Sequence, residues 1–282
     1  MFSNYTIAQL YKLFNEKLSS LYNKREIDQF LVLSFQKLMG FNKLEISMNK
    51  ELVLEESKCT EFSKILDRLM NAEPIQYILG STFFYDLELK VNPAVLIPRP
   101  ETEELVDWVL NCVKKGEELL DIGTGSGCIA LALKNKMNSL QVKGIDVSED
   151  ALQIAKWNAD HLGLEIELEK KDILKEGLNK KWNCIVSNPP YIAKNESLVM
   201  ESNVLDHEPS TALFVPDNDP LIFYERIAKL ASINLHSKGL LFFEIHEEKA
   251  EEIVKLLASL GFVNIEVKKD LQGKNRMIKA TV

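Results

Sequence analysis

The sequence predicts an α/β fold, in which helices cover both faces of a mostly parallel sheet and a small helical domain precedes it. Three observations support this prediction. From residue 101 onward, helix and strand patterns alternate, whereas the first 80 residues show helical spacing only. Two strand patterns joined by a short connection then close the chain, and they are expected to add an antiparallel hairpin to the sheet. Such alternation is typical of parallel sheets with helices on both sides.

The first 80 residues are expected to form a helical domain. Thr6 and Gln9 have the spacing of a capping box, and apolar residues follow at helical intervals. Two further helices are expected over residues 27–39, ending at Gly40, and over residues 60–71. The pattern then changes near residue 80, which marks a domain boundary.

Residues 81–98 combine aromatic and branched residues around a turn, which indicates a β-hairpin or an extended linker. The remaining residues, 99–282, carry the alternating pattern of the α/β domain. Strands are expected over residues 117–123, 140–148, 166–173, 182–188, 239–246, 262–270 and 275–282. Helices are expected over residues 104–113, 128–137, 149–163, 219–235 and 247–262. The long segment 192–219 has no regular pattern and is expected to be a lid or binding loop.

Composition narrows the classes of function. The formal net charge is −8, and residues 1–80 contribute ten basic and ten acidic residues, so the negative excess lies in the second part. Lys and Arg form no cluster longer than a pair, which argues against a nucleic-acid substrate. No apolar run approaches the roughly 18 residues of a membrane span, and the N-terminus does not resemble a secretory signal. The four cysteines lack metal-ligand spacing, so no metal site is expected. Their scattered positions also indicate no disulfide framework, so a reducing, cytoplasmic location is expected.

A glycine-rich turn is the first candidate binding element. The sequence DIGTGSG places Gly123, Gly125 and Gly127 between an expected strand and an expected helix. Glycines let the backbone approach a ligand closely, and the Gly-x-Gly-x-Gly spacing differs from the dinucleotide fingerprint. It therefore favours a cofactor without a pyrophosphate. Asp146 ends the next strand, where a carboxylate can accept hydrogen bonds from both ribose hydroxyls of an adenosine.

The sequence SNPPY, at the end of the strand 182–188, is the second candidate element. The carboxyl ends of parallel strands share one edge of the sheet, so this loop and the glycine turn are expected to open together. This loop suits a substrate with a planar amide nitrogen. Such a nitrogen has two N–H groups, which need two acceptors, and the Asn188 side-chain oxygen and the Pro189 carbonyl can supply them. Both hydrogen bonds strengthen when the nitrogen gains positive character during methyl transfer. Tyr191 is expected to offer a flat face to the planar group.

These motifs resemble a known family. DIGTGSG, GID and SNPPY, in this order, resemble class I methyltransferases that use S-adenosylmethionine and act on amide-like nitrogens. PIQYILG (74–80), VLIPRPETEELV (95–106) and VLDHEPSTAL (204–213) resemble the HemK/PrmC release-factor glutamine methyltransferases specifically. The resemblance implies a class I methyltransferase fold for residues 99–282. It also implies a substrate, the glutamine of the Gly-Gly-Gln loop of class I peptide chain release factors, which the helical domain 1–80 would dock.

The resemblance also implies roles for individual residues. Asn188, Pro189 and Tyr191 would be catalytic, and the same residues with Pro190 would bind the substrate. Residues 99–103 would approach the methionine end of the cofactor. Ile173 would contact the adenine, at a position where family members often carry an aromatic residue. The cofactor-binding residues would be Gly123, Thr124, Gly125, Ser126, Gly127, Asp146, Ile173 and Asn188.

Three alternatives remain open from the sequence. A nucleic-acid amino-methyltransferase meets the same planar nitrogen and uses the same loop, although the acidic balance and the missing target-recognition region disfavour it. A ribosomal-protein glutamine methyltransferase is a related enzyme, and the RPETE segment favours the release-factor branch. A scaffold protein with an inactive methyltransferase fold is disfavoured because the glycine turn and Asn188 are both intact.

Overall fold

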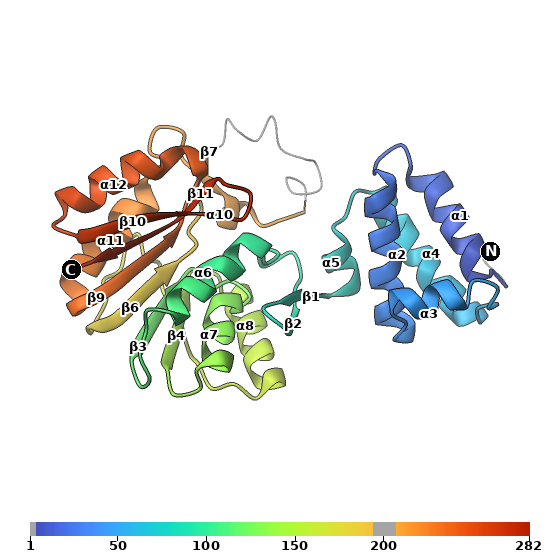
Figure 1. Ribbon diagram of the computed structural model, residues 1–282, viewed down its shortest axis with the longest axis horizontal. Coiled ribbons are helices and arrows are strands. Elements are labelled where there is room, and N and C mark those ends of the chain that lie inside the picture. Colours follow the sequence, from blue (N-terminus) through green and yellow to red (C-terminus); the bar gives the residue numbers. More distant parts are fainter. Residues whose placement is uncertain (1–3, 194–206) are drawn as a thin grey trace. The chain divides into compact units, whose positions relative to one another are not determined.

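A computed structural model describes residues 4–193 and 207–282 (Figure 1). The chain forms two compact units, which part between Gly80 and Ser81, and Glu208–Val282 belongs to the second unit. The first unit is helical and the second combines helices with a sheet. Within the described ranges, no helix has both the length and the apolar character that a membrane crossing needs.

The described residues of the helical unit form five helices, α1 (Ile7–Leu18), α2 (Lys24–Met39), α3 (Lys43–Met48), α4 (Glu56–Met70) and α5 (Ile75–Leu79). The predicted capping box at the start of α1 is confirmed. The Thr6 hydroxyl accepts from the Gln9 backbone N–H at 3.2 Å, and the Gln9 side chain accepts from the Thr6 N–H at 2.8 Å. The predicted end of α2 is also confirmed, because Gly40 caps the helix in the left-handed conformation with φ of 72°.

The predicted helix boundaries differ from the structure at the N-terminal ends. Helix α2 begins at Lys24 because Asn23 and Glu26 form a second capping box, which the sequence analysis missed. Helix α4 begins at Glu56 rather than residue 60. The short helices α3 and α5 were not predicted, since segments of 6 and 5 residues hold too few turns for a periodic pattern.

The second unit is built on a seven-stranded sheet. Its strands are β3 (Glu118–Ile122), β4 (Gln141–Asp146), β5 (Glu167–Lys170), β6 (Trp182–Ser187), β9 (Leu235–Glu244), β10 (Val263–Lys269) and β11 (Asn275–Thr281). The spatial order is β10-β11-β9-β6-β3-β4-β5. Strands β5, β4, β3, β6 and β9 pair in parallel, whereas β11 is antiparallel to both β9 and β10. The predicted α/β fold with an antiparallel C-terminal hairpin is therefore confirmed.

Helices cover both faces of this sheet (Figure 1). Successive side chains of a strand point to opposite faces, so Leu119 and Leu120 of β3 belong to different apolar cores. One core includes side chains of α6 (Pro100–Leu110), α7 (Cys128–Lys136) and α8 (Glu149–Leu162). The other includes side chains of α11 (Ile222–Asn234) and α12 (Ala250–Ser259), which follows a short 3₁₀ turn, η2 (Glu247–Lys249).

A β-hairpin opens the second unit. Strands β1 (Ser81–Phe84) and β2 (Leu87–Lys90) pair antiparallel, and the two turn residues between them, Tyr85 and Asp86, have φ of 50° and 66°. Two successive positive φ angles are typical of a type I′ turn. Helix α6 stabilises this conformation, because Glu103 accepts from the Tyr85 N–H at 2.8 Å and Asp107 accepts from the Tyr85 hydroxyl.

The segment 192–219 is more regular than predicted. Strands β7 (Ile192–Ala193) and β8 (Phe214–Val215) pair in parallel, and the single turn α10 (Ser210–Leu213) precedes β8. The two ends of the segment are thus tied together by backbone pairing, which a sequence pattern of two residues cannot reveal. The central part of the predicted lid or binding loop, residues 194–206, lies outside the described residues.

Candidate active site

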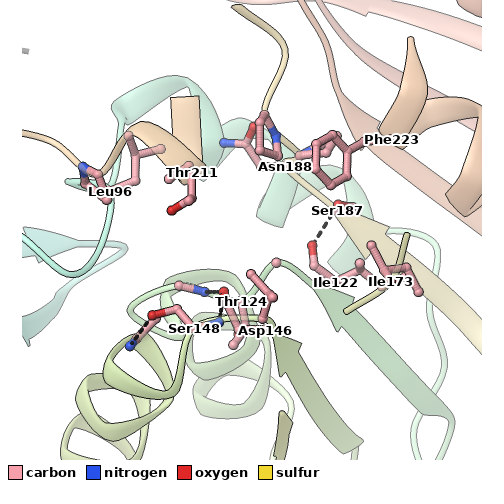
Figure 2. Close-up of a pocket in the computed structure, with 18 of the residues that line it drawn as sticks. Leu96, Ile122, Thr124, Asp146, Ser148, Ile173, Ser187, Asn188, Thr211 and Phe223 are labelled. Carbon is pink, nitrogen blue, oxygen red and sulfur yellow. Dashed lines mark hydrogen bonds between the residues drawn. The ribbon is translucent and has the colours of Figure 1, made fainter. Parts of the chain in front are cut away.

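A cavity of about 470 Å³ lies at the carboxyl ends of β3, β4 and β6 (Figure 2). Ile122, Asp146 and Ser187, the last residues of these three strands, all line it. The glycine turn and the SNPPY loop therefore open on one cavity, as the parallel arrangement predicts. The predicted site residues on its wall are Gly123, Thr124, Gly125, Ser126, Asp146, Ile173, Asn188, Pro189 and Pro190.

The glycine turn is fixed to the neighbouring strand. The backbone N–H groups of Gly123 and Thr124 donate to the Ile145 carbonyl at 2.9 and 3.0 Å. Asp146 accepts from the Gly125 N–H at 2.9 Å and from the Ser148 N–H at 2.9 Å. Burial raises the pKa of Asp146, and these backbone donors oppose that effect. A carboxylate has about four acceptor positions, and the backbone donors Gly125, Val147 and Ser148 leave room for a hydroxyl donor from the cavity.

A second acidic residue lies directly beneath the turn. Asp121 is fully buried and accepts from the Thr124 hydroxyl at 2.7 Å, which holds Thr124 against the strand end. Its other oxygen has no hydrogen-bond partner among the described residues. Burial and, to a smaller extent, the nearby negative charge of Asp146 together raise the pKa of Asp121 to about 7, against the opposing effect of the hydrogen bond from Thr124.

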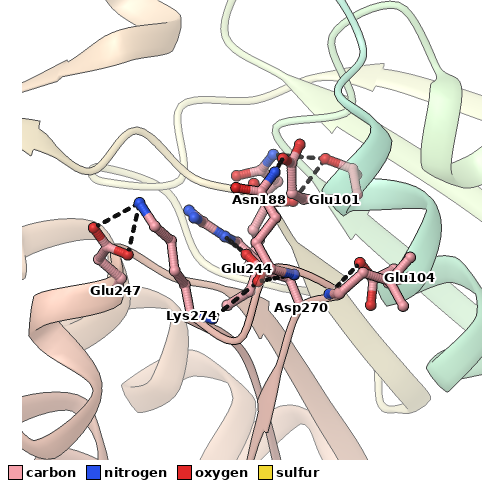
Figure 3. Close-up of polar contacts among 11 residues, drawn as sticks. Glu101, Glu104, Asn188, Glu244, Glu247, Asp270 and Lys274 are labelled. Atoms are coloured by element: carbon pink, nitrogen blue, oxygen red, sulfur yellow. Dashed lines mark hydrogen bonds and ion pairs between the residues drawn. The ribbon is translucent and has the colours of Figure 1, made fainter.

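Asn188 lies where β6 ends. The Ser187 hydroxyl donates to the Ile122 carbonyl at 2.7 Å and so joins the ends of β6 and β3. The Asn188 side-chain nitrogen donates to the Thr102 hydroxyl at 3.5 Å, and that hydroxyl donates to the Glu244 carboxylate at 2.6 Å (Figure 3). Asn188 thus belongs both to the cavity wall and to a polar chain that leads away from the cavity.

Glu244, the last residue of β9, was not among the predicted site residues. Its carboxyl is only 2% exposed, and burial raises its pKa to about 7 against the opposing effects of Thr102, Arg276 and Asn188. A charged residue at the end of the apolar strand GLLFFE is a sequence signal that could have identified it, since buried ionisable groups gather at functional sites.

Two predicted site residues do not line the cavity. The Tyr191 ring packs against His246 with ring centroids 5.9 Å apart, and its hydroxyl lies near Arg276. Burial raises the pKa of that hydroxyl. The expected flat face over the substrate does not follow from this position. Gly127 is the N-cap of α7, where a left-handed φ of 82° and the neighbouring side chains of Leu131 and Ala155 favour glycine. Packing of the helix accounts for its residue type.

The segment 99–103 reaches the cavity through two residues only. Arg99 and Thr102 line it, whereas the Glu101 and Glu103 carboxylates accept hydrogen bonds from Gln272 and Tyr85. Arg99 forms an ion pair of 2.5 Å with Glu208, whose side chain is 1% exposed. Glu208 also accepts from the Ile97 N–H at 3.4 Å, so a buried carboxylate ties the segment before α6 to the segment before α10.

The sequence analysis also missed part of the apolar wall. Ile173, the expected adenine contact, lines the cavity, and Phe223 of α11 lines it as well and supplies an aromatic ring (Figure 2). Helix α11 carries no motif, and within the motif 95–106 only residues 99–103 were expected near the cofactor. The other missed lining residues include Ala94, Val95, Leu96, Pro98, Ser148, Thr211, Ala212 and Phe214. Among the described residues, no group of His, Cys, Asp and Glu is arranged to hold a metal ion.

Comparisons with known proteins agree with this geometry. The family model "Methyltransferase small domain" matches residues 103–207, and "PrmC N-terminal domain" matches residues 22–80. The release factor glutamine methyltransferase of Flavobacterium psychrophilum is 41% identical over 272 residues, which cover 94% of this chain and 95% of the relative. The protein of the same name from Bacteroides thetaiotaomicron is 40% identical over 94% of this chain and 96% of its own length.

A solved structure supports the fold separately. The crystal structure of a methyltransferase from Pyrococcus furiosus aligns with a TM-score of 0.52 and 17% identity, over 69% of this chain and 88% of that chain. At this level of identity the likeness concerns the fold alone.

Gly127→Ala should lower stability rather than act through cofactor contact. The substitution puts a Cβ at a left-handed φ and within 3.1 Å of Leu131, so we expect the free energy of unfolding to fall by about 1–3 kcal/mol in urea denaturation. Gly177→Ala is the matched control, because its Cβ meets nothing within 4 Å, and it should change stability by less than about 1 kcal/mol. A Gly127→Ala protein with unchanged stability and weakened cofactor binding would contradict this account.

Asp121→Asn should gain stability relative to the wild type as pH rises. The native pKa of Asp121 is raised to about 7, above the ordinary value of 3.8, so the unfolded state releases its proton at lower pH than the native state does. Ionisation therefore destabilises the wild type progressively between about pH 4 and 7, which the asparagine variant escapes. Urea unfolding at pH 5 and pH 8 should show the difference in stability growing by about 1–3 kcal/mol in favour of the variant. A pH-independent difference would show that Asp121 keeps its ordinary pKa.

Proposed function

We propose that this chain, which belongs to the family of release factor glutamine methyltransferases, methylates the Gly-Gly-Gln glutamine of class I peptide chain release factors. The methyl donor would be S-adenosylmethionine, and the acceptor atom would be the side-chain amide nitrogen. The main support for this proposal is that Asn188, Pro189 and the glycine turn all line one cavity, in a chain of this family.

The cavity residues fit the cofactor. The turn 123–126 brings backbone close to the cavity, and Asp146 offers carboxylate oxygens with free acceptor positions for ribose hydroxyls. Ile173 and Phe223 supply apolar surface suited to an adenine ring. When bound, S-adenosylmethionine supplies a sulfonium methyl group that is already strongly electrophilic. The task of the protein is therefore to orient and polarise the acceptor nitrogen.

Asn188 and Pro189 would perform this task. The lone pair of a primary amide nitrogen is delocalised into its carbonyl, and two oxygen acceptors on its N–H groups favour the form in which positive charge develops. The side-chain oxygen of Asn188 and the carbonyl of Pro189 lie on the loop that follows β6, and both residues line the cavity. Because these hydrogen bonds strengthen as the methyl group arrives, they stabilise the transition state more than the bound substrate.

The helical unit is proposed to dock the body of the release factor. Residues 22–80 match the N-terminal domain model of this family. The alignment with the Flavobacterium relative covers nearly the full length of both proteins. The balanced charge of residues 1–80 suits a protein surface better than a nucleic-acid backbone. The four cysteines are free, which is consistent with the proposed cytoplasmic location.

The wild-type protein should methylate a class I release factor at one glutamine. Purified protein, labelled S-adenosylmethionine and release factor would be incubated together, and the Gly-Gly-Gln peptide analysed by mass spectrometry with and without enzyme. An unmodified peptide beside labelled DNA or ribosomal RNA would identify a nucleic-acid methyltransferase instead. Absence of heat on calorimetric titration with the cofactor would indicate an inactive scaffold.

Asn188→Ala should lower kcat by at least about 100-fold and leave most cofactor affinity intact, since it removes a hydrogen bond that matters most in the transition state. Single-turnover methylation measures the first quantity and calorimetry measures the second. Asn135→Ala, at an exposed position of α7, is the matched control and should behave as the wild type. Equal activity of the Asn188→Ala protein would remove the side-chain oxygen from the mechanism.

Removal of residues 1–80 should raise KM for the whole release factor and leave KM for a short Gly-Gly-Gln peptide unchanged. The cut falls where the two compact units part, so the sheet and its two apolar cores remain complete. Circular dichroism would first establish that the truncated protein is folded. Equal KM values for whole release factor before and after truncation would contradict a docking role.

A further inference from the structure

We infer that Glu244 is a positioning residue, which fixes the orientation of the Asn188 carboxamide both directly and through the Thr102 hydroxyl. The inference rests on the proposed function, in which the Asn188 side-chain oxygen accepts a hydrogen bond from the substrate amide. It concerns the polarity of the chain of hydrogen bonds that runs from β9, through α6, to the loop after β6 (Figure 3).

The polarity follows from the carboxylate end of the chain. An ionised carboxylate accepts hydrogen bonds and cannot donate them, whereas a threonine hydroxyl has a single proton. The distance of 2.6 Å between Thr102 Oγ1 and Glu244 Oε2 is typical of a hydroxyl that donates to a carboxylate. The pKa of Glu244 is about 7, so the carboxyl is ionised above about pH 7. In that range the proton of Thr102 is committed to Glu244, and only lone pairs remain on Oγ1 for Asn188.

The lone pairs of Thr102 select one end of the Asn188 carboxamide. The side-chain nitrogen lies 3.5 Å from Thr102 Oγ1 as a donor, and Asn188 also forms a side-chain hydrogen bond with Glu244 itself. If the Asn188 carboxamide were rotated by half a turn, its oxygen would face the Thr102 lone pairs and be repelled by them. Its NH2 group would then lie where the oxygen now faces the substrate. An NH2 group cannot accept from the substrate amide, so only the observed orientation supports the proposed chemistry.

The surroundings of Glu244 partly compensate the negative charge of this buried carboxyl. Its main chain is at the end of β9, paired with Met277 of β11. The preceding residue of β11, Arg276, places its positive charge near the carboxyl, and Asp270 holds the Arg276 guanidinium at 3.1 Å. A buried carboxylate costs stability unless such partners compensate it. A charged side chain does not stabilise an apolar strand such as β9. We attribute the presence of Glu244 to its role in orienting Asn188.

Glu244→Gln tests the inference with a side chain of nearly the same shape. The glutamine NH2 group can donate to Thr102 Oγ1, which frees the threonine proton to donate to the Asn188 oxygen and turns the carboxamide around. We expect kcat for the Gly-Gly-Gln peptide to fall by about 10- to 100-fold. KM for the peptide and Kd for S-adenosylmethionine should stay within about threefold, because neither ligand needs Glu244 for its ground-state contacts.

Substitutions of Thr102 test the same chain from its middle. Thr102→Val removes the hydroxyl at nearly constant shape and should lower kcat to a similar extent, whereas Thr102→Ser should restore most of that loss. The double variant with Glu244→Gln should lose no more than the worse single variant, because both changes break one chain. Losses that multiply, or an equal loss in the serine and valine variants, would indicate an ordinary packing role and overturn the inference.

Glu247→Gln is the matched control. This carboxylate lies three residues after Glu244 and forms an ion pair of 3.1 Å with Lys274 at the surface, so its loss should leave kcat unchanged. If the wild type and Glu244→Gln methylate the peptide at equal rates, the inference fails and the proposed function stands. If the wild type does not methylate it, the proposed function fails. Should Glu244→Gln not fold, the comparison of Thr102→Val with Thr102→Ser decides the inference alone.

Discussion

The parallel pairing of β3 with β4 and β6 is the constraint on which the site depends. Parallel strands end at the same edge of a sheet, so the loops that follow them meet although they are far apart in the sequence. The hydrogen bond from the Ser187 hydroxyl to the Ile122 carbonyl fixes the ends of β6 and β3 side by side. The bonds from Gly123 and Thr124 to Ile145 do the same for β3 and β4. The cavity inherits its shape from these backbone positions.

Two buried carboxyl groups flank this edge and reveal a compromise between stability and function. Asp121 supports the glycine turn through Thr124, and Glu244 supports Asn188 through Thr102. Burial raises the pKa of each to about 7, so holding either group in its charged form opposes folding. In both cases a buried carboxyl fixes the position of a threonine hydroxyl. That threonine in turn positions part of the cavity wall, which is the glycine turn in one case and Asn188 in the other. Side chains that need a defined orientation are thus held by hydrogen bonds rather than by apolar packing alone.

The sequence predicted those parts of the molecule that a local pattern encodes. Alternating apolar segments indicated the sheet, and the glycine spacing with SNPPY indicated the residues that meet at its edge. Tyr191 shows the limit of a motif, because its neighbours line the cavity while its own ring packs against His246. Gly127 shows that a motif can join two requirements, a binding turn and a helix start. Phe223 reaches the site through tertiary packing, which leaves no motif in the sequence. Glu244 was marked only by its charge at the end of an apolar strand.

Asn188 uses its side-chain nitrogen within the protein and so offers only its oxygen to a ligand. In the proposed mechanism this oxygen and the Pro189 carbonyl form a pair of acceptors that matches a nitrogen with two hydrogens. A nitrogen that has already received a methyl group has one hydrogen left, and one of the two acceptors then loses its partner at a desolvated position. The site would therefore bind an unmodified side chain, with two N–H groups, better than a methylated one, with one. The reaction would then stop after a single methyl group.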